Sequence, residues 1–282
     1  MNQAIAARLR EAAALLEAQD AEPFRAQAFR RAADTVDGLV ESVADILARE
    51  GPDGLQRLPG IGRGIAAAIA EMAVTGRWSR LERLRGDLDP VHLLATVPGL
   101  GPKLAARIHD ALHVDTLEGL EAAAHDGRLE QVPGIGARRA QAVRAVLGTL
   151  LARIRGPRRP PGGAPPVRVL LEVDREYRER AARGELATIA PKRFNPSGER
   201  WLPVLHTTRG EWHFTVLFSN TARAHELGRT RDWVVVYHDD GDHHEGQCTV
   251  VTEIRGALAG RRVVRGREAE CLAMVADGDD AT

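Results

Sequence analysis

Apolar residues in the first 150 positions recur at helical spacing. Between residues 2 and 18 they fall at Ile5, Leu9, Ala12, Ala13 and Leu16. This spacing places them on one face of an amphipathic helix. Similar patterns predict helices at about 23–36, 39–48, 64–75, 79–84 and 117–124, with a break at 51–54. The first half of the chain is therefore expected to be entirely helical.

The pattern changes after residue 166. Runs rich in β-branched and aromatic residues predict strands at about 201–208, 212–218, 233–237, 248–253 and 261–265. We also expect the apolar run 167–173 to be a strand, with helices following at 174–184 and 222–227. These elements predict an α+β chain whose second half is a small mixed domain with an antiparallel sheet.

A segment rich in proline, glycine and arginine separates the two halves at 155–166. Such a segment is typical of an extended, semi-stiff linker. We therefore expect an all-helical domain at 1–154, a linker at 155–166, an α+β domain at 167–275 and an acidic tail at 276–282.

One five-residue pattern, apolar-Pro-Gly-apolar-Gly, which we call a box, occurs at 58–62, 97–101 and 132–136. Each copy is followed at the same offsets by a small and then an aliphatic residue: Ala66 and Ile69, Ala105 and Ile108, Ala140 and Val143. Glycine permits a tight turn and the close approach of a phosphate, and the N–H groups that open the next helix attract an anion. The pattern resembles the helix-hairpin-helix motif, which binds the DNA backbone irrespective of sequence. The alternative is three structural corners that bind no ligand.

The charge distribution supports the same interpretation. Acidic and basic residues are equal in number, 39 of each, so bulk charge does not attract this chain to DNA. The segment 131–168 nevertheless has no acidic residue and contains Arg138, Arg139, Arg144, Arg153, Arg155, Arg158, Arg159 and Arg168. Clustered arginine is typical of phosphate binding, and the alternative is a solvated helix end and linker. The residues expected at the hairpin phosphate sites are Gly60, Gly62, Arg63, Gly99, Gly101, Lys103, Gly134, Gly136, Arg138 and Arg139.

The order and spacing of the motifs over about residues 1–150 resemble the N-terminal half of bacterial family X DNA polymerases. Besides the boxes, the matching residues are Ile5-Ala6, Leu15-Leu16-Glu17, Phe24-Arg25, 28–33, Ile65-Ala66, Gly76 before Leu81, and 116–121. The resemblance implies a gap-binding region followed by a fingers region. It also implies that Arg25 and Arg30 contact a DNA 5′-phosphate, that hairpin carbonyls could hold a monovalent cation, and that the protein acts in DNA repair, on gaps or ends.

Two departures from that family bear on activity. Its lyase members carry a Schiff-base lysine where this chain has Ala68, and the neighbouring lysine position is Gly64, so neither residue offers an amine. Beyond residue 150 no Gly-Ser loop precedes an Asp-x-Asp pair, although two-metal phosphoryl transfer needs clustered carboxylates. The acid-x-acid pair Glu172 and Asp174 lacks that loop. We therefore expect a DNA-binding protein without polymerase or lyase activity.

The C-terminal domain leaves three alternatives open. The first is a second nucleic-acid surface in which Phe194 stacks on a base and phosphates meet Lys192, Arg193, Arg265 and Arg267. The second is a hydrolytic site, as in a structure-specific nuclease, built from His206, His225, His238 and Glu253. The third is a docking module for a repair protein.

Other features indicate where the protein works. Cys248 and Cys271 are more typical of small core residues than of zinc ligands or a disulfide, so no metal is expected. The segment His243-His244-Glu245 predicts a polar turn. No apolar run approaches the roughly 18 residues that span a bilayer, and the N-terminus lacks the features of a signal peptide. We expect a cytoplasmic, nucleoid-associated protein with no membrane partner.

Overall fold

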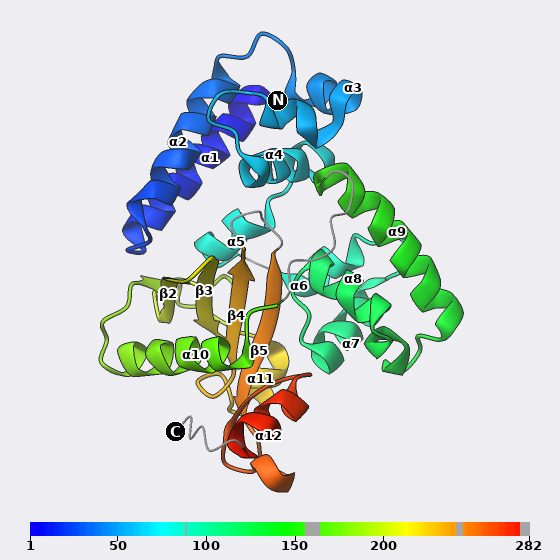
Figure 1. Ribbon diagram of the computed structural model, residues 1–282, viewed down its shortest axis with the longest axis vertical. Helices are drawn as coiled ribbons and strands as arrows, with labels where there is room; N and C mark the ends of the chain where they lie inside the picture. The colour runs from blue at the N-terminus through cyan, green and yellow to red at the C-terminus, as the bar shows by residue number, and fades with distance from the viewer. Residues whose placement is uncertain (88, 156–163, 241–244, 277–282) are drawn as a thin grey trace. The chain divides into compact units, whose positions relative to one another are not determined.

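The computed structural model describes residues 1–87, 89–155, 164–240 and 245–276 (Figure 1). Their contacts divide them into two compact units, residues 1–155 and residues 164–276. The first unit is helical and the second contains an antiparallel sheet, so the predicted α+β class is confirmed. Most of the expected linker (156–163) and tail (277–282) lies outside the described residues. Within the described part, every helix is too short or too polar to cross a membrane.

The N-terminal unit consists of helices that pack around one apolar core. They are α1 (Asn2–Ala18), α2 (Pro23–Asp37), α3 (Val43–Gln56), α4 (Arg63–Thr75), α5 (Ser79–Arg85), α6 (Pro90–Ala95), α7 (Pro102–Leu112), α8 (Leu117–His125), the 3₁₀ turn η1 (Arg128–Gln131) and α9 (Ala137–Arg155). The long helix α9 packs against α3, α4 and α8. It therefore joins the first hairpin to the last one.

Two parts of this unit differ from the sequence expectation. Helix α6 was not predicted, although Asp89 accepts a hydrogen bond from the His92 amide and Pro90 occupies the first helical position, as at many helix starts. Helix α3 continues beyond residue 48 to Gln56. The predicted break is nevertheless present inside it, because Gly51 adopts φ 64° and is not helical.

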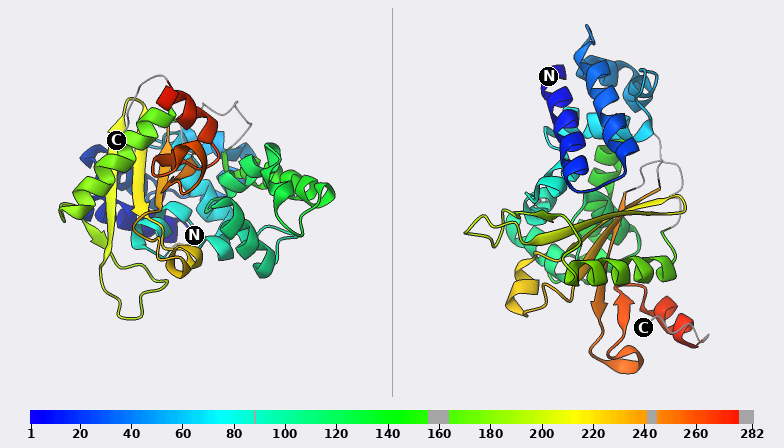
Figure 2. Two further views of the ribbon diagram at one scale, coloured as in Figure 1. Left: turned by 90° about the horizontal axis from the view of Figure 1, so that it is seen from below. Right: turned by 90° about the vertical axis from the view of Figure 1, so that its left-hand side faces the viewer.

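The C-terminal unit is a six-stranded antiparallel meander whose strands follow chain order. Its elements are α10 (Val167–Ala182), β1 (Thr188–Ile189), β2 (Leu202–Arg209), β3 (Trp212–Phe218), α11 (Ala222–Glu226), β4 (Val234–Asp239), β5 (Gly246–Thr252), the 3₁₀ turn η2 (Gly256–Leu258), β6 (Arg262–Val264) and α12 (Glu268–Ala276). A two-residue turn, with Gly210 at positive φ, joins β2 to β3. Helix α10 lies across one face of the sheet (Figures 1 and 2).

The expected strand at 167–173 is wrong. These residues form the first half of α10, which begins directly after Pro166. Val167, Leu170, Leu171 and Tyr177 are buried at helical spacing, and the polar residues between them form i,i+4 pairs such as Arg168 with Glu172. A short run of Val and Leu fits a strand and a buried helix equally well, and packing on the sheet decides in favour of the helix.

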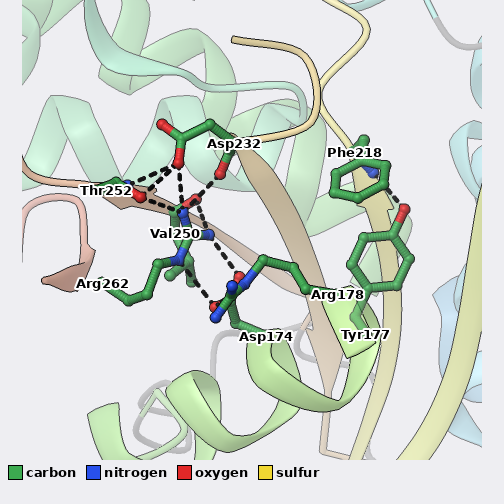
Figure 3. Close-up of polar contacts among 8 residues, drawn as sticks. All are labelled: Asp174, Tyr177, Arg178, Phe218, Asp232, Val250, Thr252 and Arg262. Carbon is green, nitrogen blue, oxygen red and sulfur yellow. Dashed lines mark hydrogen bonds and ion pairs between the residues drawn. The ribbon is translucent and has the colours of Figure 1, made fainter. Parts of the chain in front are cut away.

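Polar contacts fix α10 to the sheet at two points (Figure 3). The buried Tyr177 hydroxyl donates to the Pro203 carbonyl at 2.9 Å and accepts from the Phe218 amide at 2.8 Å. One turn earlier, the fully buried Asp174 carboxylate receives two hydrogen bonds from the Arg262 guanidinium, at 2.6 and 3.0 Å.

Arg262 also binds two groups outside α10. Its guanidinium donates to the Val250 carbonyl at 3.1 Å and to the Asp232 carboxylate at 2.9 Å. The network therefore ties α10 to β5, β6 and the segment before β4 (Figure 3). Asp174, considered above as a metal ligand with Glu172, holds an arginine instead.

Candidate nucleic-acid interface

The three boxes fold into three hairpins with the same backbone hydrogen bonds. In each, the amide of the second apolar residue donates to the carbonyl of the first: Ile61 to Leu58 at 3.2 Å, Leu100 to Val97 at 3.0 Å, and Ile135 to Val132 at 3.0 Å. The last glycine of each box then accepts the first helical hydrogen bond, from Ala66, Ala105 and Ala140. The repeated sequence therefore produces a repeated turn, each leading into α4, α7 or α9.

Side-chain burial repeats as well. The second apolar residue of each box is almost fully buried and anchors the turn: Ile61, Leu100 and Ile135. The proline and both glycines of every box are exposed. Each hairpin thus presents its bare backbone to solvent, as close contact with a phosphate requires.

The two glycines of each box have different backbone roles. Gly60, Gly99 and Gly134 have φ of 71°, 89° and 90°, in the left-handed region that L side chains avoid. The turn itself therefore requires them. Gly62 and Gly101 have φ of −78° and −73°, which any residue adopts.

The second glycines have no packing role in the chain. A Cβ built on Gly62, Gly101 or Gly136 meets no atom within 4 Å. Helices α3, α6 and α8 begin instead with side-chain caps from Ser42, Asp89 and Thr116. A glycine cap has no side chain to accept the first-turn N–H groups. The third amides of α7 and α9, at Leu104 and Arg139, donate to the carbonyl of the cap glycine. The remaining N–H groups that open α4, α7 and α9 are the donors that an anion can meet.

In the third hairpin, two arginine side chains donate hydrogen bonds to carbonyl groups of the loop. The Arg107 guanidinium, from α7, donates to the Pro133 carbonyl at 2.6 Å, and Arg139 donates to the Gly134 carbonyl at 2.7 Å. In the first hairpin the Thr35 hydroxyl donates to the Pro59 carbonyl at 2.8 Å. A monovalent cation at these oxygens of the first or third hairpin would have to displace those donors.

The cationic side chains expected to contact DNA differ in their exposure to solvent. Arg63, Lys103, Arg138, Arg139 and Arg30 have exposed side chains, and Arg25 is half-buried. Arg30 pairs with Glu17 at 2.6 Å, but both side chains are about half exposed, so water screens the pair. Arg158 and Arg159 lie outside the described residues. Arg107 was missed in the sequence because only the fold brings it to the third hairpin.

The four candidate hydrolytic residues do not converge. His206 of β2 pairs across the sheet with Thr215, and His225 lies on α11. His238 faces Trp212, and desolvation by burial lowers its pKa to about 4. Glu253 accepts the Ile254 amide and binds Arg265 at 2.7 Å. Among the described residues no three potential metal ligands cluster, and His243 and His244 lie outside them.

The four cations expected on the C-terminal surface fall into two groups. Arg265 is paired with Glu253, and Arg267 forms a two-point pair with Glu270 and donates to the Pro165 carbonyl at 2.6 Å. Lys192 and Arg193 lie instead in the loop before β2, beside the exposed ring of Phe194. The structure therefore separates the two arginines that anchor α12 from the loop that carries an aromatic side chain.

Helix α7 also carries a buried ion pair. His109 is 3% exposed, and its Nδ1 lies 3.0 Å from an oxygen of Asp115. Burial is the largest single influence and lowers the pKa of His109, but the Asp115 carboxylate, the Val114 carbonyl and the Asp110 charge together raise it by more, so it lies above the ordinary value of 6.5. The fold therefore favours the charged imidazolium. This gain in stability is complete below pH 6.5 and is lost as the pH rises through the elevated pKa.

We expect the melting temperature of the N-terminal unit to fall as the pH rises above 6.5, and Asp115→Asn to reduce this dependence because it removes the negative partner. Thermal unfolding followed by circular dichroism between pH 6 and 9 measures both effects. His92→Gln, at an exposed histidine of α6, is the matched control and should retain the slope of the unmodified protein. An equal slope in Asp115→Asn would contradict the assignment.

Known proteins resemble this chain in its N-terminal half. A family model described as a helix-hairpin-helix domain matches residues 1–78, and one described as a SAM-like helix-hairpin-helix tandem matches residues 91–149. The DNA polymerase/3'-5' exonuclease PolX of Bacillus subtilis is 29% identical over 137 residues, which are 48% of this chain and 23% of that protein. The chain thus spans less than a quarter of this relative. The similarity expected from the motifs is confirmed, and all three hairpins lie in matched regions.

Proposed function

We propose that this protein binds the DNA backbone through its three hairpins, without reading sequence. The observation that carries the proposal is the set of second glycines, Gly62, Gly101 and Gly136. Neither backbone conformation nor internal packing explains why Gly62 and Gly101 are glycines. A Cβ on any of the three residues would meet no atom within 4 Å. A phosphate that approaches the first-turn N–H groups explains them, because a Cβ would stand in its path.

The helix-hairpin-helix matches and the similarity to a DNA polymerase support DNA as the partner. The exposed side chains of Arg63, Lys103 and Arg138, close to the hairpins in sequence, add charge that phosphates attract. Backbone contacts position a protein on DNA but carry no base information. Binding should therefore depend on salt far more than on sequence.

We further propose that the protein acts in DNA repair and prefers gaps or ends to intact duplex. Arg25 and Arg30, on α2, are the residues proposed to meet a terminal phosphate. The chain is proposed to bind without polymerase or lyase chemistry. At the position of the lyase lysine, Ala68 is a small side chain 7% exposed within α4, and the neighbouring Gly64 is buried too.

Electrophoresis with labelled DNA tests this proposal. Gapped, nicked, duplex and single-stranded substrates are incubated with the protein, with and without Mg²⁺ or Mn²⁺, and run on native and denaturing gels. We expect shifted, intact DNA with every duplex-containing substrate, strongest with the gap. Metal-dependent cleavage would overturn the non-catalytic assignment, and the absence of any shift would overturn DNA binding.

A further inference from the structure

The loop before β2 exposes an aromatic ring on an unusual backbone. Phe194 has φ 53°, a left-handed conformation that is rare for a bulky residue and that often accompanies a functional site. Phe194 is 45% exposed. Of the other four phenylalanines and the four tryptophans, one is more exposed, Phe24. The fold therefore holds a large apolar ring in solvent at a cost in backbone energy.

Neighbouring aromatic groups extend this ring into a platform. The rings of Phe194 and His225 lie 4.6 Å apart, tilted by 37°, and Trp201 meets His225 edge-on at 6.5 Å. The Arg193 guanidinium lies 5.2 Å from the centroid of the Phe194 ring. Aromatic rings and guanidinium planes are the groups on which proteins stack unpaired bases.

Hydrogen bonds from Asn220, Asn195 and Arg200 fix the loop that carries the platform. The Asn220 amide donates to the Arg193 carbonyl at 2.9 Å, and its oxygen lies 2.7 Å from Nε2 of His225. Asn195 closes the loop on the Glu199 carbonyl at 2.8 Å, and Arg200 donates twice to the Thr188 carbonyl. A surface ordered in advance loses little entropy when a ligand binds.

The charge around the platform is positive. Segments 187–203 and 219–232 meet there, and they contain three acidic residues, Glu199, Glu226 and Asp232, against Lys192, Arg193, Arg200, Arg223, Arg229 and Arg231. Two of the arginines are paired, Arg223 with Glu226 and Arg229 with Asp232, and the net charge remains positive. An exposed ring surrounded by cations suits a ligand with both a flat apolar face and negative charge. A single DNA strand has both properties in every nucleotide.

We propose that the Phe194–Trp201–His225 platform binds single-stranded DNA by stacking an unpaired base on Phe194, while Lys192 and Arg193 contact the adjacent phosphates. This site lies in the C-terminal unit and is independent of the hairpins, which contact the backbone of duplex DNA. The protein then has one surface for paired DNA and a second for an exposed strand.

The test compares three fluorescein-labelled DNAs by anisotropy: a thymidine decamer, an abasic decamer with the same phosphates, and a 20-base-pair duplex. The variant is Phe194→Gly, because glycine adopts φ 53° without strain and the fold is retained. We expect about a ten-fold or greater loss of affinity for the thymidine decamer, with little change for the abasic decamer and the duplex. Phe194→Trp should retain binding of the thymidine decamer.

Ile254→Ala is the matched control, since Ile254 is an apolar residue of the same unit, 62% exposed, and should leave all three affinities unchanged. Equal binding of the thymidine decamer by Phe194→Gly and the unmodified protein would overturn the proposal. An equal loss for all three DNAs would overturn it as well, because base stacking cannot act on an abasic strand. The duplex measurement keeps this result separate from any failure of the hairpins.

Discussion

Replacing Gly62, Gly101 and Gly136 together by serine is expected to lower the affinity for duplex DNA about 100-fold, at roughly 1 kcal/mol per hairpin. The same variant should be as stable as the unmodified protein or slightly more stable. Serine is a favourable N-cap, and its hydroxyl accepts a hydrogen bond from the first helical turn. Those N–H groups are the ones that a phosphate would use, so stability and affinity should change in opposite directions.

Gly148→Ser is the matched control for this triple variant. Gly148 lies within α9, is exposed, and a Cβ there meets no atom within 4 Å. It should leave DNA binding unchanged. Anisotropy titrations and urea denaturation of both variants give the two readouts. If the triple variant bound DNA as well as Gly148→Ser does, the second glycines would have no part in phosphate binding.

Asp174→Ala is expected to lower the free energy of unfolding of the C-terminal unit by about 3–5 kcal/mol, because it leaves the Arg262 guanidinium buried without its main counter-charge. Asp174 is fully buried and the Arg262 side chain is 13% exposed, so water compensates little of the loss. Three of the four tryptophans lie in this unit, at Trp201, Trp212 and Trp233, so tryptophan fluorescence in urea reports its unfolding.

Arg178→Ala provides the control for this prediction. Arg178 also binds Asp174, at 3.0 Å, but its side chain is 37% exposed, and its loss should cost less than about 1 kcal/mol. The double variant Asp174→Leu with Arg262→Met should recover part of the stability, because neither Asp174 nor Arg262 is then left as a buried unpaired charge. Asp232 loses Arg262 but keeps the hydrogen bond from the Thr252 hydroxyl. A loss in Asp174→Ala as small as the loss expected for Arg178→Ala would show that the network does not hold α10 on the sheet.

Sequence alone predicted the features that depend on local chemistry. The hairpins could be identified because a positive φ requires glycine at Gly60, Gly99 and Gly134, and this requirement recurs at the same place in each five-residue pattern. The antiparallel strands follow from equally local patterns. Helix α10 was misassigned at its start because a run of Val and Leu carries no period of its own.

Contacts between distant residues could not be predicted in this way. Asp174 and Arg262 are 88 residues apart, and only the packing of α10 on the sheet brings them together. The same holds for Arg193 and Asn220, 27 residues apart, which fix the Phe194 loop. The sequence did single out Lys192, Arg193 and Phe194, but it grouped them with Arg265 and Arg267, which the fold pairs with Glu253 and Glu270.

The most direct test of backbone recognition is a titration of the unmodified protein with several 20-base-pair duplexes of unrelated sequence, at 50 to 200 mM salt. We predict the same affinity for every sequence and a logarithmic salt slope of about −3 to −5, from roughly three to six neutralised phosphates. Affinity that differs strongly between sequences, or that does not respond to salt, would contradict the assignment of the three hairpins as phosphate-binding sites.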